Sequence, residues 1–139
     1  MKTILVVEDE MPILNLMRLI LQSDGYRVLE AASGEQARQW FAKAHEPIDL
    51  VISDVSLPGD SGILVALELR SVFSNLRIII SSGYPPSAWN DQEVAELNEL
   101  PSDSVTTIEK PFSPLTLLDK VHALIGGAEG ANTMERGRS

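Results

Sequence analysis

The sequence predicts an α/β fold in which a doubly wound, parallel five-stranded sheet carries helices on both faces. Two observations lead to this fold class. Five short runs of apolar, largely β-branched residues recur along the chain, and each is followed by a segment with helical spacing of its apolar residues or with turn and capping residues. Strands that alternate with helices in this way form parallel sheets with right-handed crossovers, which place helices on both faces.

The strands are expected where short apolar runs are bounded by charged residues or by turn residues such as Pro58-Gly59. The first run is apolar throughout, as in a strand buried on both faces of a parallel sheet. The last has high β-propensity. The expected strands are Ile4–Val7, Arg27–Ala31, Leu50–Ser53, Arg77–Ser81 and Val105–Glu109.

The helices are expected from apolar residues three and four positions apart and from capping residues. Ser33 and Gln36 have the spacing of a capping box, and Ser113 can cap the last helix. The expected helices are Met11–Ser23, a segment from Ser33 to about Ala44, Gly62–Val72, the acidic segment Gln92–Leu100, and a last helix with Leu117, Leu118, Val121, Leu124 and Ile125 on its apolar face.

Composition narrows the functions that are open to this chain. Twenty acidic and eleven basic residues give a net charge of −9, which argues against binding nucleic acid or an anionic membrane and favours cations or a basic partner. The lack of cysteine excludes disulfides and thiolate chemistry. No apolar stretch reaches the ~20 residues of a membrane helix. We expect a cytoplasmic protein with one domain over residues 1–125 and a flexible tail or truncated linker over 126–139.

Polar side chains follow four of the five expected strands. Glu8 and Asp9 follow the first strand, Asp54 the third, Ser82 the fourth and Lys110 the fifth. In doubly wound sheets, ligands bind beyond the carboxyl ends of the strands, near the point where the strand order reverses. We therefore expect these side chains to meet at one edge of the sheet.

This set of groups suits phosphoryl chemistry. Neighbouring carboxylates repel one another unless a cation offsets their charge, and Mg²⁺ prefers carboxylate and water oxygens. An incoming phosphate would complete the coordination of the ion. Lys110 would then neutralise phosphoryl oxygens, Ser82 would donate a hydrogen bond to one, and Asp54 would attack phosphorus to form an acyl phosphate.

These motifs resemble the receiver domains of bacterial two-component response regulators, such as chemotaxis regulators and the receivers of hybrid histidine kinases. The resemblance covers about residues 2–125 and implies a flavodoxin-like fold with strand order 2-1-3-4-5. The motifs are Glu8-Asp9, Asp54, Pro58-Gly59 with Gly62, Ser82-Gly83 and Lys110-Pro111-Phe112.

The resemblance also implies roles for individual residues. Asp54 would accept a phosphoryl group from a histidine kinase or a histidine phosphotransfer protein. Glu8, Asp9, Asp54 and the backbone carbonyl of Ser56 would hold Mg²⁺. No enzymatic activity is expected beyond self-phosphorylation and slow autodephosphorylation.

Ser82 would be the switch hydroxyl, in preference to Ser81, because it directly precedes a glycine. Lys110 would contact the phosphoryl group, or Asp54 before transfer, and the Lys110–Pro111 peptide would be cis. A downstream protein would bind at the face formed by the fourth helix, fifth strand and last helix. A homodimer that depends on phosphorylation is also open.

Three positions depart from the family pattern. Ser82 is a conservative departure, since the switch hydroxyl is more commonly a threonine. Thr107 stands three residues before Lys110, where many receivers carry a Tyr or Phe whose rotation reports phosphorylation, so Tyr84 or Trp89 is a hypothetical replacement. Ser61 stands where many members have Asp.

Simpler interpretations also exist for these residues. Glu8-Asp9 can cap the first helix, and Asp54 can be a turn residue. The acidic run fits a solvated helix face better than a dock for a basic partner; it consists of Asp91, Glu93, Glu96 and Glu99.

Other functions are open at this point. The chain can be the receiver of a hybrid histidine kinase, or a degenerate receiver that acts only as a binding module. A Mg²⁺-dependent phosphohydrolase of the haloacid-dehalogenase type is disfavoured, since Asp9 is followed by Glu10-Met11 where those enzymes carry Asp-x-Asp.

Overall fold

The computed structural model describes residues 1–127, so the expected tail lies outside the described residues except for Gly126 and Gly127. The main sheet consists of β1 (Thr3–Val7), β2 (Arg27–Ala31), β3 (Leu50–Asp54), β6 (Arg77–Ser82) and β7 (Val105–Glu109). The helices are α1 (Met11–Ser23), α2 (Gly34–Lys43), α3 (Gly62–Val72), α4 (Asp91–Asn98) and α5 (Pro114–Ile125). Among these residues, no helix is both long enough and apolar enough to cross a membrane.

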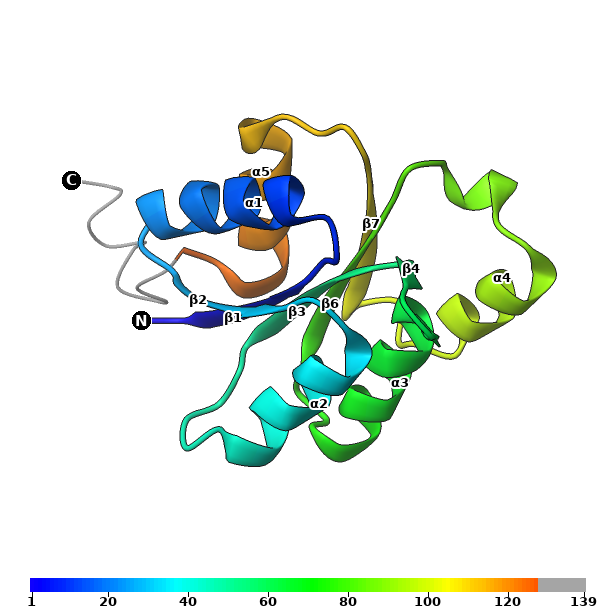
Figure 1. The fold of residues 1–139 in the computed structure, drawn as a ribbon, viewed down its shortest axis with the longest axis horizontal. Helices are drawn as coiled ribbons and strands as arrows, with labels where there is room; N and C mark the ends of the chain where they lie inside the picture. The colour runs from blue at the N-terminus through cyan, green and yellow to red at the C-terminus, as the bar shows by residue number, and fades with distance from the viewer. Residues whose placement is uncertain (128–139) are drawn as a thin grey trace.

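The sheet is parallel throughout, with the order β2-β1-β3-β6-β7. This order confirms the predicted 2-1-3-4-5 arrangement. Figure 1 shows α1 and α5 on one face of the sheet and α2 and α3 on the other, with α4 beyond α3. Because β1 lies inside the sheet and β2 at its edge, the strand order reverses at β1, next to β3.

The two faces of the sheet build separate apolar cores. Side chains alternate along each strand, so Ile4 of β1 packs toward α1 and α5 while Leu5 packs toward α2 and α3. Both side chains are fully buried. This double burial explains why the central strands are apolar at nearly every position rather than alternating with polar residues.

Capping residues set the starts of several helices. The Ser33 side chain accepts a hydrogen bond from the Gln36 backbone N–H, as predicted. Asn90 and Glu93 form a reciprocal capping box, so α4 begins at Asp91 and ends at Asn98, earlier than the expected Gln92–Leu100. The Lys110–Pro111 peptide is cis, which confirms that prediction.

Two short features were not predicted. Strands β4 (Ser56–Leu57) and β5 (Asp60–Ser61) form an antiparallel hairpin directly after β3. A single 3₁₀ turn, η1 (Pro86–Ala88), lies between β6 and α4. Both features lie in the connections that leave the carboxyl ends of the strands, beside the expected site.

Candidate functional site

The predicted strand-end residues do meet at one edge of the sheet. Glu8 directly follows β1, Asp54 ends β3, and Lys110 directly follows β7. The Lys110 Nζ atom lies 2.8 Å from Glu8 Oε1 and 3.3 Å from Asp54 Oδ2. A lysine far from both acids in the sequence thus forms ion pairs with the ends of two other strands.

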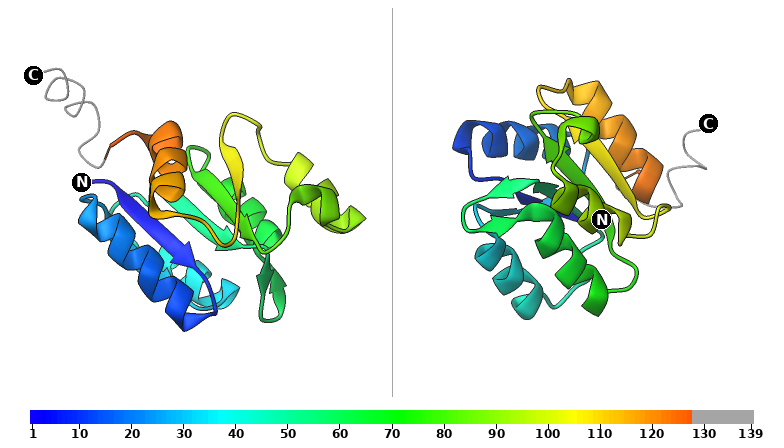
Figure 2. Two further views of the ribbon diagram at one scale, coloured as in Figure 1. Left: turned by 90° about the horizontal axis from the view of Figure 1, so that it is seen from above. Right: turned by 90° about the vertical axis from the view of Figure 1, so that its right-hand side faces the viewer.

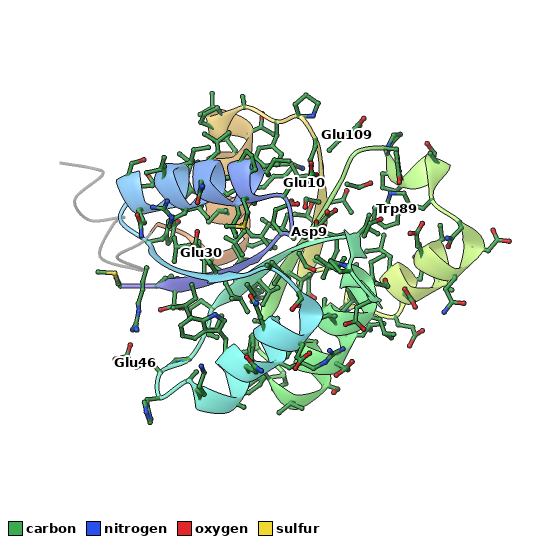
Figure 3. The ribbon with its side chains drawn as sticks, viewed as in Figure 1. Asp9, Glu10, Glu30, Glu46, Trp89 and Glu109 are labelled. Carbon is green, nitrogen blue, oxygen red and sulfur yellow. The ribbon has the colours of Figure 1, made fainter. Side chains whose placement is uncertain are left out.

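Asp9 completes a cluster of three carboxylates. Glu8, Asp9 and Asp54 each offer an oxygen, and these oxygens all lie within 4.8 Å of one another. Glu8 and Asp54 are buried, whereas Asp9 is exposed and lies near the start of α1 (Figure 3). The cluster is therefore closed on the protein side and open to solvent at Asp9.

Burial makes the charged forms of the inner carboxylates unfavourable. Desolvation raises the pKa of Glu8 and of Asp54, although hydrogen bonds and attraction from Lys110 oppose both shifts. Burial alone would lower the pKa of Lys110, but its pairing with Glu8 and Asp54 outweighs that effect and raises it. One ammonium group thus lies beside the cluster of three carboxylates, and Glu10 Oε2 is 3.9 Å from the same nitrogen.

This donor set fits a hard divalent cation. Oxygen ligands from one or two carboxylates, with solvent access for water and phosphate, are what Mg²⁺ requires. A cation would also offset the cost of burying these negative charges, which is the main cause of the raised pKa of Glu8 and Asp54, and the smaller repulsion between the carboxylates. The fourth protein ligand expected here, the carbonyl of Ser56, belongs to a residue whose N–H donates to Asp54 Oδ1 at 3.4 Å.

The alternative that Glu8 or Asp9 caps the first helix is wrong. The N-cap of α1 is Glu10, which makes no side-chain capping bond. Instead, the Glu10 N–H donates to Glu8 Oε2 at 3.2 Å, which helps to fix that carboxylate inside the cluster.

Gly62 has a role that the sequence did not reveal. A Cβ atom on Gly62 would lie 1.6 Å from the backbone oxygen of Asp54 and 2.6 Å from Ser53 Oγ. The first turn of α3 therefore packs directly against the backbone of the candidate phosphoacceptor. The signal in the sequence was a glycine at a helix start, which alone does not distinguish a close approach from a loop residue.

Ser82 and Ser81 are both buried at the end of β6. Ser82 Oγ accepts a hydrogen bond from the Tyr84 N–H at 3.1 Å, and Ser82 lines a cavity of about 430 Å³ that also contacts Thr107. Ser81 is the register partner of Asp54 across the β3–β6 ladder, and its carbonyl accepts a bond from Val55.

The two candidate aromatic reporters differ in their surroundings. Trp89 is only 7% exposed, and its indole N–H donates to the Tyr84 carbonyl at 3.2 Å. The Tyr84 side chain is 51% exposed and borders the cavity that Thr107 also lines. Of the two, Tyr84 has the freedom to move, and Trp89 anchors the loop that carries it.

The interpretation of the acidic run as a fully solvated face is wrong for one residue. Glu96 is buried, and its carboxylate accepts hydrogen bonds from Ser61 Oγ at 3.0 Å and Gln92 Nε2 at 3.1 Å. The Ser61 bond joins the start of α3 to α4. The serine that replaces the usual aspartate thus avoids placing two carboxylates together.

The family model of the response regulator receiver domain matches residues 4–122. The chain belongs to this family. Among curated proteins, the chain is 33% identical over 135 residues to the aerobic respiration control protein ArcA of Escherichia coli, covering 97% of this chain and 53% of ArcA. It is 34% identical over 124 residues to the sensor kinase CckA of Brucella abortus, covering 88% of this chain and 12% of CckA.

Solved receiver structures share the fold of this receiver. The response regulator TrrA of Thermotoga maritima, solved in complex with Mg²⁺ and BeF, is 33% identical with a TM-score of 0.66, covering 87% of this chain and 98% of TrrA. The receiver spans about half the length of curated relatives such as ArcA. The predicted family and fold are thereby confirmed.

Proposed function

We propose that this receiver takes a phosphoryl group onto Asp54 from a histidine kinase or a histidine phosphotransfer protein in the cytoplasm. The reaction would depend on Mg²⁺ and would switch a protein-binding surface. The observation that carries the proposal is the convergence of Glu8, Asp9, Asp54 and Lys110 from three separate strand ends, with the Lys110 ammonium within 3.3 Å of Asp54.

The ion would be held by the carboxylates of Glu8, Asp9 and Asp54 and by the Ser56 carbonyl. Bound there, Mg²⁺ supplies positive charge that neutralises the oxygens of the phosphoryl group during transfer. Support comes from the three carboxylates within 4.8 Å of one another and from the raised pKa of the two buried ones.

The chain's own residues would carry the transfer. An Asp54 oxygen forms a bond to phosphorus while the bond from phosphorus to the donor atom breaks. That donor atom is a histidine nitrogen in a protein donor, or the acyl oxygen in acetyl phosphate. Lys110 would shift from Asp54 Oδ2 toward the new phosphoryl oxygens, and the Ser82 hydroxyl would donate to one of them. Asp54 is then restored only by slow hydrolysis, so we propose no other catalytic turnover.

A protein donor needs a docking surface beside Asp54. The outer face of α1 exposes Met11, Leu16 and Leu19, each more than half exposed. Large apolar side chains grouped on one exposed helix face are typical of interaction sites. Since α1 begins directly after the Glu8–Glu10 segment, a donor held there would bring its phosphohistidine to the carboxylate cluster.

One comparison bears on whether this receiver acts within a larger protein. The similarity to a 12% portion of the sensor kinase CckA favours a second arrangement, in which the same receiver chemistry serves a hybrid histidine kinase. The chemistry at Asp54 is the same in both arrangements.

Labelling with acetyl phosphate tests the phosphoacceptor directly. We expect intact-mass measurement to show one phosphoryl group on the wild type in the presence of Mg²⁺, and none without it. Asp54→Asn should abolish the label. Asp60→Asn is the matched control, because Asp60 lies in the adjacent hairpin but pairs with Arg38 outside the cluster. Label that persists in Asp54→Asn would place the nucleophile elsewhere, and an unlabelled wild type would favour the binding-module alternative.

A further inference from the structure

Strand β7 has a free edge. It is the last strand of the sheet and pairs with β6 alone in the part of the chain that the structure describes (Figure 2). Two bonds fix the direction of its backbone groups. The Ile78 N–H donates to the Ser104 carbonyl at 2.8 Å, and the Lys110 N–H donates to the Ser82 carbonyl at 2.7 Å.

In a parallel ladder, alternate residues of a strand direct both backbone groups to the same neighbour. Since Ser104 and Lys110 face β6, the residues at even-numbered positions between them do so as well. The N–H and C=O groups of Val105, Thr107 and Glu109 therefore point away from the sheet, along the unpaired edge.

Two hollows flank this edge and share Thr107. The larger, of about 430 Å³, lies between the β6–α4 connection, β7 and the start of α5, with Trp89 and Phe112 in its wall. The smaller, of about 320 Å³, lies between the end of α4 and β7, with Leu97 and Leu100 in its wall. Both hollows have polar and apolar side chains in their walls, and together they border the free edge from Val105 to Glu109.

The surface around this edge is acidic. Residues 91–125 contain seven acidic residues and two lysines, a formal net charge of −5 out of −9 for the whole chain. Of the seven acids only Glu96 is buried, and Lys120 lines the larger hollow together with Glu109. Glu109 is exposed at the end of β7 (Figure 3), whereas the nearby Lys110 is bound to Glu8 and Asp54. A second copy of this chain would bring the same negative charge to the contact, so the surface suits a basic partner instead.

We propose that the free edge of β7 binds an extended, basic segment of a partner protein, which adds to the sheet as a further strand. The outward backbone groups of Val105, Thr107 and Glu109 pair with the main chain of that segment. Alternate side chains of an added strand point to the two faces of the sheet. Apolar ones enter the two hollows, and lysine or arginine side chains reach Glu109 and the exposed acids of the α4 region.

This surface adjoins the candidate switch. Ser82 lines the larger hollow, and its Oγ accepts a bond from the Tyr84 N–H that would break if the hydroxyl turned to a phosphoryl group on Asp54. The wall beside Tyr84 would then change shape. This coupling rests on the proposed function, whereas strand addition does not. If phosphorylation changes the affinity for the segment, the bound segment must change the phosphorylation equilibrium by the same factor.

The test uses a labelled peptide of alternating lysine and valine residues, blocked at both ends, and follows its fluorescence anisotropy with the unphosphorylated full chain. Thr107→Pro removes an outward N–H without removing a β6 bond, and proline is tolerated on strand edges. We expect the dissociation constant to rise by about tenfold or more in Thr107→Pro. Thr107→Val, which keeps the N–H and the shape of the side chain, should bind as the wild type does. A peptide with glutamate in place of lysine should not bind measurably.

A second measurement covers the case in which Thr107→Pro does not fold. The same lysine–valine peptide, N-methylated at every residue, keeps its side chains and charge but has no N–H to donate along either edge, and it should bind the wild type at least about tenfold more weakly. Equal binding of both peptides, or unchanged binding to a folded Thr107→Pro variant, would overturn strand addition. A concentration-dependent dimer that Thr107→Pro abolishes would assign the edge to a second copy and also overturn the proposal. Because Asp54→Asn is expected to bind the peptide like the wild type, loss of labelling at Asp54 and loss of peptide binding are separate outcomes.

Discussion

Replacing Gly62 with alanine tests how the phosphoacceptor is held. The added Cβ would lie 1.6 Å from the Asp54 backbone oxygen, whereas ordinary contact begins at 3.4 Å, so the two backbones must separate by about 1.8 Å. Neither side yields easily. Asp54 ends a central strand, and the Gly62 N–H donates to the Val55 carbonyl at 2.9 Å.

The expected cost follows from this geometry. Overpacking of a core typically costs about 1–3 kcal/mol, and because backbone meets backbone here we expect a value of about 3 kcal/mol or more. For a chain of this size, that lowers the melting temperature by on the order of 10 °C. A displacement of Asp54 by about 1 Å or more should slow labelling by acetyl phosphate about 100-fold at saturating Mg²⁺.

Gly83→Ala is the matched control for this experiment. A Cβ on Gly83 meets nothing within 4 Å, and the φ angle of Gly83 is not in the left-handed region. We expect it to melt and to be labelled as the wild type. Calorimetry and mass measurement of the time course give both quantities. Suppose that the free energy of unfolding of Gly62→Ala differed from that of the wild type by less than about 1 kcal/mol, and that both were labelled at the same rate. The close approach of α3 to Asp54 would then be refuted.

Three further predictions concern charge. Burial raises the pKa of Asp54, so ionisation of this group lowers the stability of the fold as pH rises from 3.8 through the folded-state pKa. In metal-free buffer at neutral pH, Asp54→Asn should therefore unfold at a higher urea concentration than the wild type. A lower urea midpoint would contradict this. Mg²⁺ at 100 times its dissociation constant should stabilise the wild type by about 2.7 kcal/mol, and a chelator or Asp9→Asn should remove the gain; equal stabilisation of Asp9→Asn would exclude Asp9 as a ligand. Burial raises the pKa of Tyr26 from 10.0 to about 12, so wild-type stability should fall between those pH values, whereas Tyr26→Phe should lack that component. An ultraviolet titration in which Tyr26 ionises near pH 10 would be incompatible with this.

The sequence allowed the fold and the core of the site to be predicted for the same reason. Parallel strands share a direction, so once the strands were located, Asp54 and Lys110 had to end at one edge of the sheet although they come from different strands. Their ion pair, with 3.3 Å between Nζ and Oδ2, follows from the topology and not from any local pattern.

The features that sequence reasoning missed depend on contacts between distant segments or on very short elements. The β4–β5 hairpin has two residues in each strand, too few for a period of two to appear, and its Pro58-Gly59 tip was interpreted only as a turn. Glu96 lies among exposed acids, and the Ser61 hydroxyl that accounts for its burial comes from a different element. The close approach of Gly62 to Asp54 is likewise visible only when both elements are placed in space.

The charge balance of the site connects it to the edge strand. Three carboxylates and one ammonium carry a formal charge of −2, which a divalent cation would cancel; an acyl phosphate on Asp54 would then leave the site at −1. Glu8 and the phosphoryl oxygens would then compete for the Lys110 ammonium. Because Lys110 directly follows β7 and its N–H bonds to the Ser82 carbonyl at 2.7 Å, a shift of either residue acts on the end of that strand without a long chain of contacts. Coupling between Asp54 and the β7 edge therefore requires only Ser82 and Lys110, each with two alternative partners. Allosteric coupling depends on two-state elements of this kind.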